Sequence, residues 1–165
     1  MGKEINTKAM VARFNSFDVS LEKRTDVGQK TNVWVKSPTF EEVSRKLLHD
    51  LDVVMITGTN HLDRSPSAYD FFCDFIPHKN IIIGITPPEL YMRISQELSA
   101  PPSGGMQFLS LLKEISGKID KKNLSGFSFS VNDALKGVNG EANQKLPYNH
   151  HWTKEVDYIA KSITA

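Results

Sequence analysis

The chain has 165 residues, of which 39% are hydrophobic and 24% charged, and its 20 basic and 19 acidic residues leave a formal net charge of +1 with neutral histidines. This balance is typical of a folded globular protein and does not favour nucleic acid as a partner. The single cysteine, Cys73, excludes an internal disulfide and a cysteine-based zinc site, and the absence of a long apolar run excludes a membrane partner. We therefore expect one cytoplasmic domain over residues 1–165.

Strand-like and helix-like segments alternate in the first half of the chain. Apolar runs predict strands over residues 9–14, 32–35, 52–57 and 80–86. Helix starts and apolar spacing predict helices over residues 37–51, 65–76 and 87–97. Because residues 53–57 and 81–85 are continuous apolar runs, we expect them to be the central strands of a sheet covered on both faces.

The second half gives fewer signals. Residues 106–119 and 152–163 have apolar side chains at helical spacing and predict two helices. Phe127 and Phe129 alternate with serines, which predicts a strand with one apolar face that lies in the interior or, as the alternative, between copies of the chain. The connection over residues 137–151 is long enough to be a functional loop, for which a mobile surface loop is the alternative.

This order of elements predicts an α/β fold. Strand, helix and strand repeat as in parallel sheets, and right-handed crossovers place helices on both faces of such a sheet. The sequence therefore predicts a three-layer α/β/α sandwich with a mostly parallel sheet.

Polar residues follow the two central strands. Ligands of open parallel sheets bind beyond the carboxyl ends of the strands, so the segments 57–66 and 86–91 are candidate binding loops for a small planar ligand. His61 is a candidate general acid or base, with a surface histidine as the alternative. The adjacent pair His150 and His151 does not favour a shared metal ion, because neighbouring helical residues point in different directions, and we predict no metal site. No catalytic motif identifies a catalytic residue.

The segment from Asp52 to Ile94, DVVMITGTNHLDRSPSAYDFFCDFIPHKNIIIGITPPELYMRI, resembles the middle of a flavodoxin-like domain. The resemblance implies an FMN-binding redox protein, an electron-transfer protein or a reductase, with a protein redox partner. It also implies that two loops flank the flavin ring and that the loop after the first strand holds the phosphate. The implied cofactor-binding residues are Asn15, Ser16, Ser20, Thr57, Gly58, Thr59, Asn60, His61, Pro87, Pro88 and Tyr91.

Two alternatives remain beside the flavoprotein. The segment VARFNS, Val11 to Ser16, resembles the first strand of lumazine synthases, and PTFEEVSRKL resembles their ribityl-binding segment, which implies an enzyme of that kind. The same fold also serves as a cofactor-free interaction or regulatory module. A homo-oligomer is compatible with each of these functions.

Overall fold

The structure is a computed structural model that describes residues 1–15, 17, 19–37, 51–58, 80–125 and 150–164. The chain divides into two compact units, Met1–Thr86 and Pro87–Ala165. The two hydrophobic clusters of the described residues fall one in each unit. The single domain over residues 1–165 therefore stays a prediction.

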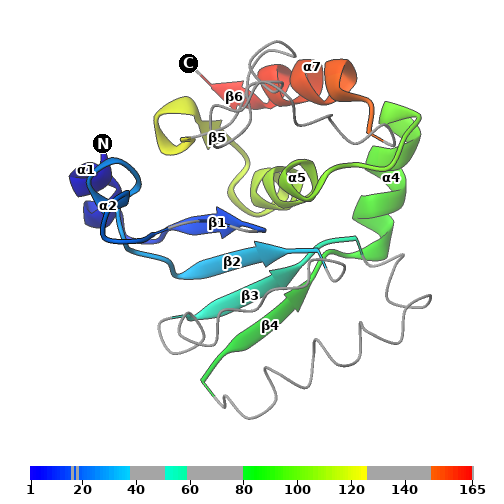
Figure 1. Cartoon of the computed structure of the whole chain (residues 1–165). Helices are drawn as coiled ribbons and strands as arrows, with labels where there is room; N and C mark the ends of the chain where they lie inside the picture. The colour runs from blue at the N-terminus through cyan, green and yellow to red at the C-terminus, as the bar shows by residue number, and fades with distance from the viewer. Residues whose placement is uncertain (16, 18, 38–50, 59–79, 126–149, 165) are drawn as a thin grey trace. The chain divides into compact units, whose positions relative to one another are not determined.

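The first unit contains a parallel sheet of four strands, which confirms the α/β class. Its strands are β1 (Ala12–Phe14), β2 (Val33–Lys36), β3 (Val53–Ile56) and β4 (Ile82–Ile85). They pair in the order β1-β2-β3-β4, and every pair is parallel (Figure 1). A flavodoxin sheet has the order 2-1-3-4-5, in which the first strand is internal. In the described sheet the first strand lies at an edge.

The prediction of a central, buried strand is confirmed for β3 and wrong for β4. Val54 and Ile56 of β3 are completely buried. Strand β4 lies at the other edge of the described sheet, and Ile82 is 66% exposed and Ile85 46% exposed. An apolar run favours the extended backbone at either place, because β-branched side chains suit a strand wherever it pairs. The run therefore predicted the strand correctly but not its burial.

The core of the sheet lies on one face of β2 and β3. Trp34 is beside Val54 in the parallel register, and Ile56 lies two residues further along β3, so the three side chains share a face. They form a buried cluster with Leu51, against which Phe17 and Ile81 pack. On the opposite face Gly84 makes room for Met55, since a Cβ at Gly84 would lie 2.8 Å from the Met55 sulfur.

Two short helices precede the second strand. Helix α1 (Gly2–Thr7) contacts α2 (Arg24–Val27), and neither was predicted from the sequence. Their close approach depends on Gly2, because a Cβ there would lie 2.4 Å from the carbonyl oxygen of Arg24. The guanidinium of Arg13 donates to the carbonyls of Val27 and Gly28 and so binds the end of α2 to β1.

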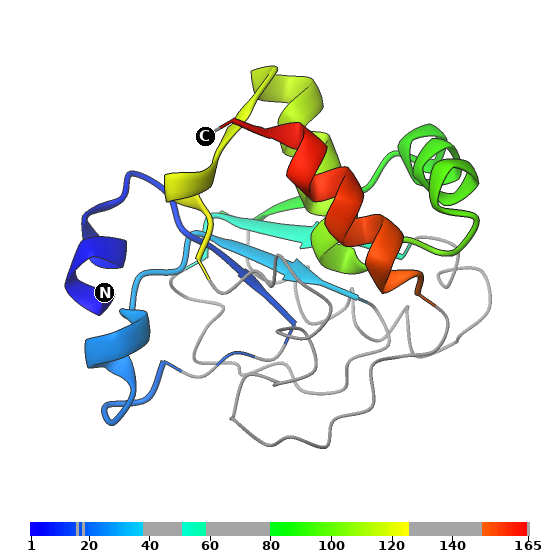
Figure 2. The same cartoon turned by 90° about the horizontal axis from the view of Figure 1, so that it is seen from above.

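The second unit is mainly helical. Its helices are α4 (Pro88–Leu98), α5 (Gly104–Ser116) and α7 (Trp152–Ser162), and α5 contacts both of the others (Figure 2). A single turn of 3-10 helix, η2 (Lys121–Asn123), follows β5 (Ile119–Asp120). Strand β5 pairs in parallel with β6 (Ile163–Thr164). None of the helices within the described residues is long and apolar enough to cross a membrane.

The predicted helices of this unit are confirmed with small changes at their ends. The helix predicted over residues 106–119 begins at Gly104, since Ser103 accepts the N–H of Met106 as its cap. It ends before Gly117, whose φ of 76° is the left-handed conformation that glycine adopts easily. Ile119 and Ile163 leave the predicted helices and join the small β5-β6 sheet instead.

Several predictions fall outside the described residues. They concern most of the helix over residues 37–51, the helix over residues 65–76, the strand with Phe127 and Phe129, and most of the loop over residues 137–151.

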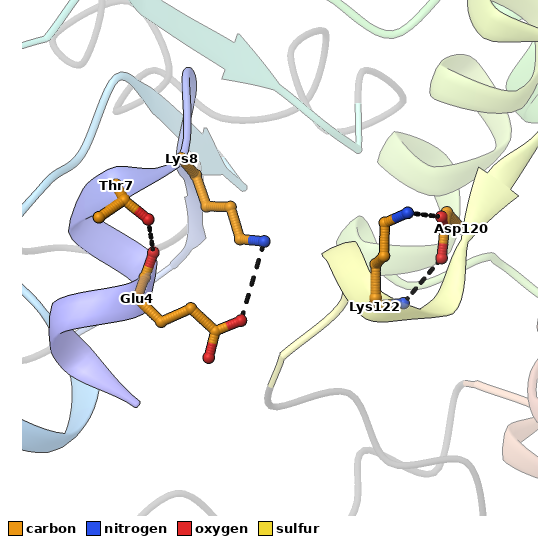
Figure 3. A network of polar contacts seen from close by, with 5 residues as sticks. All are labelled: Glu4, Thr7, Lys8, Asp120 and Lys122. Atoms are coloured by element: carbon orange, nitrogen blue, oxygen red, sulfur yellow. Dashed lines mark hydrogen bonds and ion pairs between the residues drawn. The ribbon is translucent and has the colours of Figure 1, made fainter.

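Both units have exposed ion pairs. At the end of α1, the ammonium of Lys8, which is the C-cap, lies 3.9 Å from the carboxylate of Glu4, and the hydroxyl of Thr7 donates to the carbonyl of Glu4 (Figure 3). After β5, the ammonium of Lys122 lies 2.7 Å from the carboxylate of Asp120, which also accepts the backbone N–H of Lys122. Exposed pairs of this kind contribute little to stability.

Candidate functional site

The four parallel strands of the first unit end at the same side of the sheet, its carboxyl edge (Figure 1). Asn15 follows β1, Ser37 follows β2, Thr57 follows β3 and Thr86 follows β4. Ligands of open parallel α/β sheets bind beyond this edge. We call these four residues and Lys36, the last residue of β2, the edge site.

Asn15 is held in a left-handed conformation, with a φ of 45°. Its backbone N–H donates to the carbonyl of Val35 (2.8 Å), its carbonyl accepts the indole N–H of Trp34 (2.8 Å), and its Oδ1 accepts the N–H of Ser37 (3.2 Å). Such a conformation is uncommon outside glycine and clusters at ligand sites. Within the described residues the Asn15 Nδ2 has no hydrogen-bond partner, so this fixed, half-buried side chain retains two donors.

The two threonines of the edge site stabilise the sheet. Both are buried, and each donates twice to the neighbouring strand. Thr57 donates its N–H (2.9 Å) and its hydroxyl (3.4 Å) to the carbonyl of Lys36. Thr86 makes the same two bonds to the carbonyl of Ile56. Their hydroxyls extend the ladder of hydrogen bonds by one residue beyond the strand ends.

Lys36 is a charged residue in a buried position, with only 1% of its surface exposed. Its ammonium lies 5.1 Å from the centre of the Trp34 ring, which is cation–π distance. Burial lowers the pKa of this ammonium from 10.5 to about 8. A buried lysine with a lowered pKa, at the edge where ligands of open parallel sheets bind, is a candidate functional residue.

The structure brings part of the predicted cofactor site together. Asn15 and Thr57 lie at the carboxyl edge, and Gly58 leaves that edge with a φ of 73°. Ser20 instead begins the turn into α2, where its carbonyl accepts the N–H groups of Lys23 and Arg24. Four further predicted residues lie outside the described part of the chain: Ser16, Thr59, Asn60 and His61.

The second predicted ring-binding loop is the start of a helix. Pro87 is the N-cap of α4, Pro88 is its first residue, and Tyr91 lies in its first turn, where its N–H donates to the carbonyl of Pro87. These three residues belong to the second unit. Whether they contact a cofactor stays a prediction.

A second polar cluster lies between α5 and α7 and was not predicted. Glu155 is 3% exposed, and its two carboxylate oxygens accept the N–H (2.7 Å) and the hydroxyl (2.6 Å) of Ser103. Ser103 is the N-cap of α5. Burial raises the pKa of the Glu155 carboxyl, although the bonds from Ser103 and the proximity of His150 oppose the rise.

His150 precedes α7 and lies near Glu155 in space. Its Nδ1 is 2.8 Å from the carbonyl oxygen of Pro101, and its ring meets that of Trp152 edge to face at 5.3 Å. A carbonyl can only accept, so His150 donates its Nδ1–H to the carbonyl oxygen of Pro101. The contact with Pro101 therefore leaves Nε2 as the ring nitrogen that does not make this bond.

Both missed residues had a signal in the sequence. Lys36 ends an apolar run that was correctly predicted as a strand. Glu155 lies three residues after Trp152 and four before Ile159, so it interrupts the apolar stripe of a correctly predicted helix. A charged residue on an apolar face is a candidate for a buried functional group. Among the residues that the structure describes, none of the His, Cys, Asp and Glu side chains form a group of three that could hold a metal ion.

Comparisons of the chain with protein-family models, curated proteins and solved structures found no match.

Proposed function

We propose that the first unit binds a small phosphorylated ligand with a planar ring, of the nucleotide class, at the edge site. The observation that carries this proposal is Asn15, whose left-handed backbone is held by three hydrogen bonds while its Nδ2 donors remain for a ligand oxygen. Lys36 adds a positive charge at the same edge, which favours an anionic ligand.

FMN is the member of this class that the flavodoxin resemblance implies. In this finer proposal the chain is a three-layer α/β/α flavodoxin-like protein, the flavin carries electrons, and the edge site holds the cofactor. The order β1-β2-β3-β4 differs from that of a flavodoxin. The experiment therefore compares FMN with nucleotides that lack a flavin, and it includes a cofactor-free interaction module as an outcome.

The test is calorimetric titration of the full chain with FMN, riboflavin and the four ribonucleoside monophosphates. We expect at least one phosphorylated compound to bind, and Asn15→Gly to weaken that binding about ten-fold or more, as loss of a hydrogen bond to a charged group does. Glycine keeps the left-handed backbone and removes only the side chain.

Asn32→Gly is the matched control. Asn32 lies at the amino end of β2, where its Oδ1 accepts the N–H of Val11 and its Nδ2 donates to Asp52. We expect this variant to bind the ligand as the unchanged chain does. If none of the six compounds binds, the ligand-binding proposal is wrong, and a cofactor-free interaction module becomes the better hypothesis.

A second candidate function is acid–base chemistry in the second unit, with His150 Nε2 as the base that takes a proton from a hydroxyl or water. The contact of Nδ1 with Pro101 favours this role, because it leaves Nε2 as the ring nitrogen that does not make this bond. Hydrolysis of p-nitrophenyl acetate is a direct assay of such a nitrogen. His150→Ala should abolish the hydrolysis above background, while His151→Ala, at the exposed neighbouring position, should retain it. Equal rates for the two variants would remove this candidate.

A further inference from the structure

Trp34 contacts the loop after β1 at two points. Its indole N–H donates to the carbonyl of Asn15 (2.8 Å), and its ring meets that of Phe17 edge to face, with the centroids 6.3 Å apart. The guanidinium of Arg13 lies 5.6 Å from the centre of the Phe17 ring. The indole is 2% exposed and packs against Val54 and Ile56 in the core.

These contacts connect the core of the sheet to a strained residue. A left-handed asparagine costs free energy and persists only where its surroundings hold it. Of the three hydrogen bonds on Asn15, two come from the backbone of β2 and its end, and only the one from Trp34 comes from a side chain. Trp34 is thus the side chain through which packing in the core acts on the conformation of Asn15.

From this geometry we infer that Trp34 is the positioning residue of the edge site: its indole N–H holds the Asn15 carbonyl and thereby presents the Asn15 amide to the ligand. The inference rests on the proposed ligand binding at the edge site. A ligand oxygen on the Asn15 amide then perturbs the Trp34 indole through the Asn15 backbone, so this indole reports on binding that occurs in the first unit.

The first test is a double-mutant cycle on ligand affinity, with the ribonucleoside monophosphates and FMN as probes. Trp34→Phe keeps an aromatic ring in the core but removes the N–H donor, and we expect about five-fold to ten-fold weaker binding. In the Asn15→Gly background the same replacement should have no further effect, because the side chain that Trp34 positions is already gone. A structural role of Trp34 elsewhere would give the same loss in both backgrounds.

The second test leaves Trp34 in place, so it does not depend on the folding of Trp34→Phe. The chain has two tryptophans, and the Trp152→Phe variant retains only Trp34. In this variant, labelled with ¹⁵N, we expect the Trp34 indole N–H resonance to shift on addition of a monophosphate that binds. Asn15→Gly in the same background should abolish the shift.

The outcomes separate the inference from the proposed function. If no probe binds, the ligand-binding proposal fails and the inference fails with it. If a probe binds but the Trp34 resonance does not move, or if the Trp34→Phe and Asn15→Gly effects are additive, ligand binding stands and the positioning role of Trp34 is wrong. The positioning role of Trp34 is established if Trp34→Phe weakens ligand binding in the unchanged chain and has no further effect in the Asn15→Gly background.

Discussion

Among the residues that the structure describes, Lys36 in the first unit and Glu155 in the second are buried charged residues, and burial shifts the pKa of both. Burying a charge costs free energy unless partners compensate. Glu155 accepts two hydrogen bonds from Ser103, and the ammonium of Lys36 lies against the Trp34 ring. Positions that carry such a cost are candidates for function, and substitution of each gives a measurable pH dependence.

Lys36→Met should stabilise the fold near neutral pH. With a pKa of about 8 in the folded state and 10.5 in the unfolded state, the unfolded chain binds more protons between these values. The penalty of the charged lysine is complete below pH 8, amounts to at most about 3 kcal/mol, and disappears as the pH rises toward 10.5.

Urea unfolding of both proteins at pH 7, 9 and 10.5 measures this penalty. The free energy of unfolding of the unchanged chain should approach that of Lys36→Met as the pH rises. A difference that is constant over this range would show that burial does not lower the pKa of Lys36.

Glu155→Gln tests the raised pKa of the Glu155 carboxyl, at pH values below 7. The folded-state pKa of Glu155 is raised, so its protonated form is the one that folding favours. The unchanged chain should therefore gain stability relative to Glu155→Gln as the pH falls from 7 through that pKa. Thermal unfolding of the two proteins between pH 7 and 4.5 measures the difference. A relative loss of stability on acidification would contradict the raised pKa.

At the scale of elements, β3 and β4 have similar sequences and different environments. Both are apolar runs that form parallel strands, but Val54 is completely buried and Ile82 is 66% exposed. The edge position of β4 in the described sheet accounts for this difference. The two strands therefore respond differently to the same change.

A carboxylate at Ile82 should be tolerated, whereas one at Val54 should not. Ile82→Asp keeps its charge in water, so we expect a loss of about 1 kcal/mol or less, mainly from strand propensity. Val54→Asp buries an unpaired charge and should cost several kcal/mol. Circular dichroism during thermal unfolding measures both. If the melting temperature of Ile82→Asp fell as far as that of Val54→Asp, β4 would be a buried strand after all.

At the scale of the whole molecule, two compact units each bury their own cluster of side chains. Trp34 belongs to the cluster of the first unit and Trp152 to helix α7 of the second. The prediction of a single domain implies that both tryptophans report one cooperative transition. Two separate hydrophobic cores favour two unfolding transitions instead.

We expect the single-tryptophan variants Trp34→Phe and Trp152→Phe to show different midpoints of urea unfolding by fluorescence. Circular dichroism of each variant is the control, because it follows the secondary structure of both units at once. The transition that it records should extend over both fluorescence midpoints. A common midpoint, with circular dichroism and fluorescence coincident in both variants, would support one domain over residues 1–165.

The sequence alone predicted most of the described strands and helices, because their signals are local. The apolar run at β3, the prolines that begin α4 and the serine and glycine at the ends of α5 act through neighbours in the chain. Asn15 and Thr57 were named as cofactor-binding residues because the flavodoxin resemblance implies binding loops after the strands that they follow. Ser20 was named on the same ground, but it lies in the turn before α2 and follows no described strand. The sequence did not show this difference between Ser20 and Asn15.

Only the tertiary structure decided which residues are buried and which strand lies at an edge. The sheet order exposes Ile82, buries Lys36 and places the Trp34 indole on Asn15, and the packing of α7 against α5 brings Glu155 to Ser103 from 52 residues away. Burial, pKa and backbone strain depend on neighbours in space, and periodicity along the chain carries no information about which segments become neighbours.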